Sequence, residues 1–165
     1  AIRWNRLAME FAEQSDQPRA GGWLGSLYNN LGWTYHDRGD FEQALELFER
    51  GAAWREAREP EEPKRIARWS VARALRSLGR TEEALARQQQ LLEDYTAAGQ
   101  RSGYVFEELA ECHLLLGHGN EAREFFAEAW KELSQDEWLR TAEPDRLARL
   151  RELGGLAGVD GSASS

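Results

Sequence analysis

Three stretches of the chain carry the same landmark residues at the same spacing, and this repetition constrains the fold more than any other feature. A small residue comes first, a glycine follows seven residues later, and an alanine follows five residues after the glycine. The three sets, which lie 40 and then 38 residues apart, are Gly32, Gly39 and Ala44; Ala72, Gly79 and Ala84; and Ala110, Gly117 and Ala122. A repeat of this length is typical of solenoids, in which similar helical units stack in a row.

Each repeated stretch predicts two helices with a turn between them. In the first stretch, Leu27 and Leu31 have the four-residue spacing of one helix face. Gly39 is the kind of residue that ends a helix in a left-handed conformation. Asp40 is expected to cap the next helix, with Gln43 completing a capping box. The second helices of the three units are expected at 41–58, 81–98 and about 120–133.

The small landmark residues are expected to let the two helices of a unit approach closely. In the first unit, Gly32 is predicted to face Ala44 across the tightest contact, while large residues such as Phe48 fill the space around it. The composition agrees with a helical fold, because 23 Ala, 22 Glu and 21 Leu are good helix formers. Two Ile and three Val are too few for a sheet-rich fold.

Composition and charge also narrow the class of protein. The 165 residues amount to about one domain, and 41% of them are hydrophobic, which suffices for a core. A single cysteine rules out an internal disulfide framework and a cysteine-cluster zinc site. A net charge of −8 argues against nucleic-acid binding. Without a secretory signal or a long apolar run, a soluble cytoplasmic protein with no membrane partner is expected.

The landmarks of the first unit follow a known motif. They are Tyr28, Leu31, Gly32, Tyr35, Ala44 and Phe48. This pattern resembles the tetratricopeptide repeat family, whose signature is W-x2-L-G-x2-Y, then A-x3-F, then P. The other two units depart from it, for example at Gln88 and His113, and the closing proline is missing from its usual place in all three. The long period and the Asn29-Asn30-Leu31-Gly32 run are similar to repeats of kinesin light chains and of bacterial peptide-sensing regulators.

The resemblance implies an all-α fold: a right-handed superhelix of antiparallel helix pairs that binds a protein or an extended peptide in a concave groove. Three helix pairs are expected at about 22–58, 63–98 and 101–134, after a leading half repeat at 1–14 and before a capping helix region at 135–153 and a disordered tail at 154–165.

In this family the first helix of each pair lines the groove. The residues that would face a ligand are Asn29, Asn30, Trp33, Trp69, Arg73, Arg76 and Tyr104. Asparagine can pair with a peptide backbone through both its donor and its acceptor, and aromatic rings give contact area at low entropic cost. The alternative is that Trp33 and Trp69 only pack between adjacent units.

Positive charge is concentrated in one segment. Residues 63–80 carry six basic and no acidic side chains, whereas 41–62 sum to −4 and 101–143 to −6. Arginine presents a fork to carboxylates, so this segment could hold an acidic peptide. The alternative, of about equal weight, is internal pairing with Glu107, Glu108 and Glu111 on the next first helix.

No motif supports catalysis, a cofactor or a metal. The glycines at 21, 22 and 25 lack the preceding strand that a dinucleotide site needs. The three histidines, His36, His113 and His118, show no metal-ligand spacing. Cys112 shares a helix face with leucines and is expected to be a small buried thiol.

The two ends of the chain suggest how the solenoid is bounded. Residues 1–14 resemble the second helix of a repeat, with apolar Ile2, Leu7 and Phe11, and Trp4 is expected to pack there. An exposed half repeat favours association, so a homo-oligomer is expected. Because the sequence has no initiator methionine, the chain is also expected to be part of a longer protein, in which it could be a structural or regulatory module. At the other end, Leu147 and Leu150 of the capping region are expected to cover the last repeat, while Arg146, Arg149 and Arg151 stay in solvent.

Overall fold

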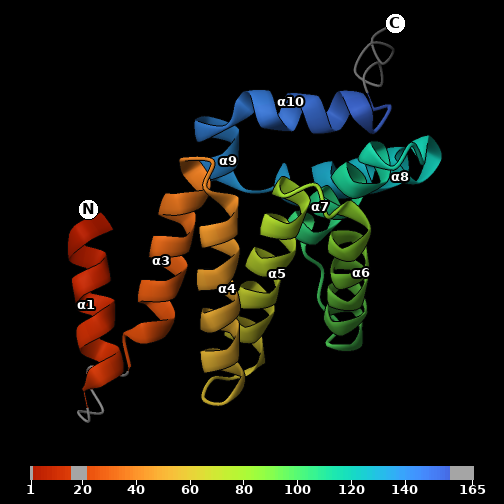
Figure 1. The fold of residues 1–165 in the computed structure, drawn as a ribbon. Helices are drawn as coiled ribbons and strands as arrows, with labels where there is room; N and C mark the ends of the chain where they lie inside the picture. Colours follow the sequence, from red (N-terminus) through yellow and green to blue (C-terminus); the bar gives the residue numbers. More distant parts are fainter. Residues whose placement is uncertain (1, 16–21, 157–165) are drawn as a thin grey trace, which may run out of the picture. The chain divides into compact units, whose positions relative to one another are not determined.

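The computed structural model describes residues 2–15 and 22–156, and all regular secondary structure within these ranges is α-helical (Figure 1). Contacts divide the chain into two compact units, Ala1–Arg80 and Thr81–Ser165, which are described separately. None of the described helices is both long and apolar enough to cross a lipid bilayer. The expected all-α fold of adjacent helices is confirmed.

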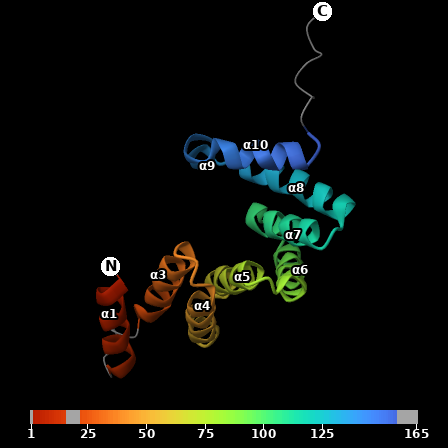
Figure 2. The same ribbon diagram turned by 45° about the horizontal axis from the view of Figure 1, so that its top comes forward.

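The first unit is built around one central helix. Its helices are α1 (Ile2–Gln14), α3 (Leu24–Asp37), α4 (Phe41–Glu56) and α5 (Glu61–Ser77). Helix α4 contacts both α3 and α5, and α1 lies against α3 (Figures 1 and 2). Glu13 accepts hydrogen bonds from the Tyr28 hydroxyl, 2.6 Å away, and from Arg50. These bonds join the end of α1 to both helices of the first pair.

The second unit ends in two short helices that cover its helix pair. Its helices are α6 (Thr81–Ala97), α7 (Gly103–Leu115), α8 (Gly119–Leu133), α9 (Glu137–Ala142) and α10 (Pro144–Leu153). Helix α7 contacts α6 and α8, and α10 runs beside α8 (Figure 2). The core residues, drawn from α7 to α10, are Phe106, Ala110, Ala122, Phe126, Ala129, Leu133, Leu139, Leu147 and Leu150.

Glycines end the first helix of each repeated stretch, as the sequence predicts. Gly39, Gly79 and Gly117 have φ angles of 78°, 77° and 79°. A β-carbon is strained in this left-handed region, so glycine is the residue that allows the tight turn into the following helix. The second helices begin within one residue of the predicted positions and end within two.

The predicted capping box at the start of α4 is wrong. Asp40 is the residue before the helix, but its side chain makes no capping hydrogen bond. The Gln43 amide instead donates to Glu46, 2.9 Å away, on the next turn of the same helix. Side-chain caps do occur at Ser102, which accepts from the Val105 amide, and at Asp136.

Helices α3 and α4 approach closely where they carry glycines. A β-carbon built on Gly32 would lie 2.5 Å from the Phe48 ring, and one on Gly25 would lie 2.9 Å from the Trp54 ring. The three atoms nearest the Gly32 position all belong to Phe48, so the prediction that Ala44 faces Gly32 is corrected. The glycine makes room for a ring, because no real β-carbon fits at these distances.

Gln88 is an unusual core residue of the second unit. It occupies the position that Phe48 and Phe126 hold in the other repeated stretches. Its side chain is fully buried, and neither its amide oxygen nor its amide nitrogen has a hydrogen-bond partner among the described residues. Burying an unpaired amide costs stability.

We predict that Gly32→Ala lowers the free energy of unfolding by about 1–3 kcal/mol, the usual cost of overpacking a tight contact. Gly119→Ala is the matched control, because a β-carbon there meets nothing within 4 Å. Urea denaturation of both variants measures the difference. Equal stability of the two variants would contradict the close contact between Gly32 and Phe48.

We predict that Gln88→Met raises the unfolding free energy by about 1 kcal/mol or more, because it removes an unpaired amide while keeping the length of the side chain. Gln89→Met, at the exposed neighbouring position, is the control and should be near neutral. Thermal melts of the two variants provide the test. A destabilised Gln88→Met protein would show that the amide is hydrogen-bonded in solution.

Candidate functional site

Two tryptophans connect the first helices of neighbouring pairs in the first unit. Trp33 of α3 and Trp69 of α5 have ring centroids 5.9 Å apart, and Trp33 also lies 4.9 Å from the Phe48 ring of α4. Both indoles are half-buried, so each also presents an edge to solvent. We call the surface where α3 and α5 meet the α3–α5 seam. Its middle is aromatic.

One end of the α3–α5 seam is polar and positively charged. The Ser77 hydroxyl lies 2.9 Å from Nε2 of His36 and accepts a hydrogen bond from Arg73, 2.5 Å away. Burial, and then the nearby charge of Arg73, lower the pKa of His36 below its usual range, and Arg76 acts in the same direction. His36 is therefore neutral at neutral pH, and its Nε2 can accept a hydrogen bond from the Ser77 hydroxyl.

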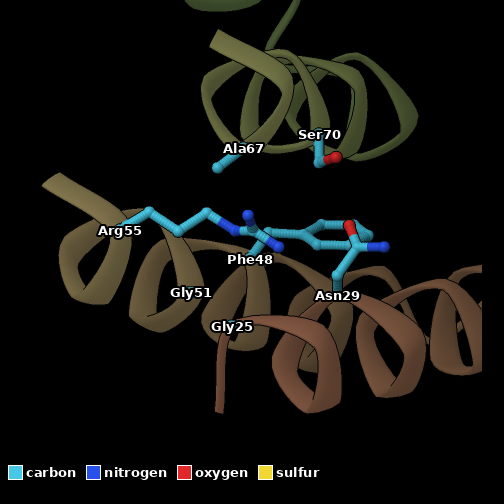
Figure 3. Close-up of a pocket in the computed structure, with 7 residues that line it drawn as sticks. All are labelled: Gly25, Asn29, Phe48, Gly51, Arg55, Ala67 and Ser70. Atoms are coloured by element: carbon cyan, nitrogen blue, oxygen red, sulfur yellow. The ribbon is translucent and has the colours of Figure 1, made fainter. Parts of the chain in front are cut away.

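The other end of the seam holds a small notch between α3, α4 and α5. The notch encloses about 190 Å³ of open space, part of it continuous with solvent, and its lining residues are Gly25, Asn29, Phe48, Gly51, Arg55, Ala67 and Ser70. Figure 3 shows the Asn29 amide and the Arg55 side chain reaching toward the Phe48 ring, with Ser70 pointing toward them from the facing helix. A β-carbon on Gly25 would lie 2.9 Å from the Trp54 ring, and one on Gly51 would lie 3.0 Å from Tyr28, so both glycines let α3 and α4 approach closely beside the notch.

The structure brings together some of the sequence-predicted site residues and separates others. Asn29, Trp33, Trp69 and Arg73 all belong to the α3–α5 seam. Asn30 is exposed on α3, and its backbone carbonyl accepts a hydrogen bond from Thr34.

Two predicted residues need separate description. Arg76 lies on α5 one turn beyond Arg73 and contributes to the positive charge around His36. Tyr104 belongs to the second unit, where the Arg146 guanidinium lies 5.6 Å from the centre of its ring. Sequence reasoning missed Arg55, because its spacing on α4 carries no signal that its side chain lines the notch beside Gly25 of α3.

The positive segment 63–80 is partly paired within its own unit. Lys64 lies 3.2 Å from Glu61, and Arg68 lies 2.6 Å from Glu56. Arg65 is buried. Near the start of α5, Lys64 and Arg68 are therefore paired with acidic side chains, and Arg65 is buried. Further along the same helix, Arg73 donates a hydrogen bond to Ser77 of the seam.

Arginines of α10 pair with the acidic residues of α7 in the second unit. Arg146 binds Glu107 through two bonds, at 2.8 and 2.5 Å, and Arg149 binds Glu111 in the same forked manner. The pairing of Glu107 with Arg146 raises the pKa of the guanidinium. The expectation that the arginines of α10 stay in solvent holds for Arg149, which is exposed, but not for Arg146 and Arg151, which are half-buried. Arg146 and Arg149 fasten the capping helix to α7.

A pair of histidines in the second unit also escaped sequence analysis. Nδ1 of His113 lies 3.1 Å from Nδ1 of His118, across the turn at Gly117, and the His113 ring stacks on Phe125. Burial, and then the nearby His118, lower the pKa of His113. No group of three or more metal-ligating side chains occurs in the part of the chain that the structure describes. Cys112, as expected, is fully buried.

Comparisons with known proteins agree with this geometry. The sequence model of the tetratricopeptide repeat family matches residues 24–97. One similar solved structure is described as nearly identical TPR-like repeats of a kinesin light chain from Podosopora anserina, with 23% identity, a TM-score of 0.62, and coverage of 80% of this chain and 68% of that chain. Its Q17M variant has 19% identity and a TM-score of 0.66, and covers 94% and 78%. No curated protein matches significantly.

We predict that mild acid destabilises the second unit through His113. Its pKa is lower in the folded state than in the unfolded chain, so the unfolded state binds more protons and stability falls as the pH drops below about 6.5. His118→Asn removes one of the two interacting charges and should reduce the loss. Urea midpoints at pH 7.5 and 5.5 provide the measurement. His36 contributes equally in both proteins, so an unchanged pH dependence in His118→Asn would contradict the coupling of the pair.

Proposed function

Residues 24–97 of this chain are tetratricopeptide repeats, and from this premise we propose that the chain is a scaffold that binds another protein or an extended peptide along the α3–α5 seam. In this proposal the chain has no catalytic activity of its own and needs no cofactor. It works in the cytoplasm, where a single buried cysteine such as Cys112 stays reduced.

The observation that carries the proposal is a half-buried aromatic pair between two polar ends. Trp33 and Trp69 contact each other, yet each keeps part of its ring open to solvent. Partly exposed tryptophans at the centre of a surface are frequent anchors of binding energy. Their mutual packing supports the binding role as well, because it holds both rings in place before a ligand arrives.

The two ends of the seam offer different contacts to a bound peptide. At the notch, the Asn29 amide offers both a donor and an acceptor to a peptide backbone. The part of the notch that admits a water molecule, about 10 Å³, has room for a single one, so the notch offers polar contacts to a ligand rather than a pocket for a whole side chain. At the opposite end, Arg73 and Arg76 make the surroundings of His36 positive, which favours a carboxylate. The preferred ligand is therefore an extended peptide with both acidic and apolar side chains.

We propose Tyr104 as a contact residue of the second unit, independent of the α3–α5 seam. Its ring is partly exposed, at 39%, and the Arg146 guanidinium lies over it. Since Glu107 and Glu111 beside it are neutralised by arginines of α10, the acidic charge of α7 would not repel an acidic ligand there.

A second candidate function is self-assembly through the first helix, as a structural or regulatory module of a longer protein. Leu7 and Phe11 are exposed on α1, at 46% and 66%, and Trp4, which was expected to pack, is 73% exposed. Ile2 is half-buried. Contiguous apolar side chains on a surface favour association.

We predict that Trp69→Ala weakens peptide binding more than Arg76→Ala, because ring burial supplies most of the affinity while an exposed ion pair contributes only about 0–1 kcal/mol. The probes are fluorescein-labelled ten-residue peptides in which Leu or Trp alternates with Asp and Glu, titrated by fluorescence anisotropy at 50 and 300 mM salt. Only the Arg76→Ala effect should shrink strongly at the higher salt concentration.

Controls separate binding from folding in this titration. Arg140→Ala changes an exposed arginine of α9 and should bind like the wild type. Circular dichroism melts establish that Trp69→Ala remains folded. If the Trp33, Trp69, Arg73 and Arg76 variants all bind the peptides like the wild type, the seam only holds neighbouring helices together and the proposed function fails.

A further inference from the structure

Helix α1 has two apolar faces and uses only one of them. Met9 and Ala12 are buried on the side that meets α3. Trp4, Leu7 and Phe11 follow at intervals of three and four residues, so they form one stripe along another side of the helix. Their exposures of 73%, 46% and 66% show that nothing in the described part of the chain covers this stripe.

Helix α4 shows what such a second face does elsewhere in this unit. It contacts α3 on one side and α5 on another, so both of its apolar faces meet a helix. The stripe of α1 has the length and spacing to meet one helix in the same way. Its occupant must therefore be a helix that presents large apolar side chains at intervals of three and four residues.

We propose that the stripe pairs with α1 of a second copy of this chain, in an antiparallel dimer. This inference rests on the proposed self-assembly and is independent of peptide binding at the seam. In the antiparallel register, Trp4 lies opposite the partner's Phe11, and Leu7 lies beside the partner's Leu7 near the two-fold axis. The adjacent Ala8 is small, so the two helices can approach closely at that point.

Charge complementarity favours this register and direction. Arg3 and Glu10 each precede a stripe aromatic by one residue and lie seven residues apart, so both occupy the same flank of the stripe. An antiparallel two-fold pair brings identical flanks together, which places Arg3 near the partner's Glu10 twice. A parallel pair would set this flank against the opposite one, which carries the uncharged Asn5 and Ala8.

The size of the stripe sets the expected affinity. A stable interface buries about 800 Å² on each partner, which is more than three side chains on one helix provide. The dimer is therefore weak, with a dissociation constant of roughly 100 μM. It would form at high local concentration, for example when the chain is attached to an oligomeric partner.

Sedimentation equilibrium between 10 and 500 μM tests whether the dimer forms. The wild type should dimerise, and Leu7→Glu/Phe11→Glu should remain monomeric with an unchanged melting temperature, because these side chains are exposed. Trp138→Glu, which changes an exposed tryptophan of α9, is the control and should dimerise like the wild type. A monomeric wild type, or an unaffected Leu7→Glu/Phe11→Glu variant, would overturn the self-assembly itself.

Charge reversal tests the antiparallel register separately. Arg3→Glu and Glu10→Arg should each raise the dissociation constant about fivefold or more, because each creates two like-charge contacts. The double variant Arg3→Glu/Glu10→Arg should return to the wild-type value, because it restores both ion pairs with their signs exchanged. Dimers that form without this pattern of loss and rescue would overturn the register while leaving self-assembly intact.

A cysteine experiment locates the two-fold axis. Cys112 is fully buried, so a new cysteine on α1 is the reactive one under mild oxidation. Leu7→Cys should form a disulfide-linked dimer by itself. Trp4→Cys should cross-link efficiently only when mixed with Phe11→Cys. Efficient cross-linking of Trp4→Cys alone would indicate a parallel pair and contradict the proposal.

Discussion

The contact between Gly32 and Phe48 is the constraint on which the candidate site depends. Because no β-carbon separates α3 from the ring, Phe48 lies deep between the helices and is almost fully buried. The Phe48 ring also packs against Trp33 and lines the notch beside Asn29. Trp33 then meets Trp69 of α5. If α3 and α4 lay further apart, the Phe48 ring and the two tryptophans would not occupy these positions.

The first helices of the two units make different contacts, and this difference is the reason for proposing a binding surface in the first unit. In the first unit, the side chains between α3 and α5 are aromatic or polar, and several remain half-exposed. In the second unit, the acidic side chains of α7 are held in forked ion pairs by Arg146 and Arg149 of α10. Such pairs fix the orientation of the capping helix. The seam of the first unit is therefore the binding surface that we propose.

Sequence reasoning succeeded where a property follows from the backbone of a few neighbouring residues. Gly39, Gly79 and Gly117 end helices because their left-handed conformation is local. Predictions failed where a side chain has several possible partners, because separation along the chain does not indicate which of them it binds. Gln43 pairs with Glu46 rather than capping α4, and Arg146 is half-buried through its pairing with Glu107, 39 residues away, rather than fully exposed. Several competing partners of similar energy were available in each case.

The sequence by itself determined the helical class, the repeat period and the turn positions, because helix propensity, apolar spacing and glycine φ angles act within about ten residues. It also restricted the candidate residues to the first helices. Only the tertiary structure decided which side chains meet: that Phe48 fills the space over Gly32, that Arg55 lines the notch beside Gly25, and that Trp4 faces outward. These outcomes depend on the distance and rotation between packed helices. The volumes of all the contacting side chains set those quantities together, and no single segment contains them.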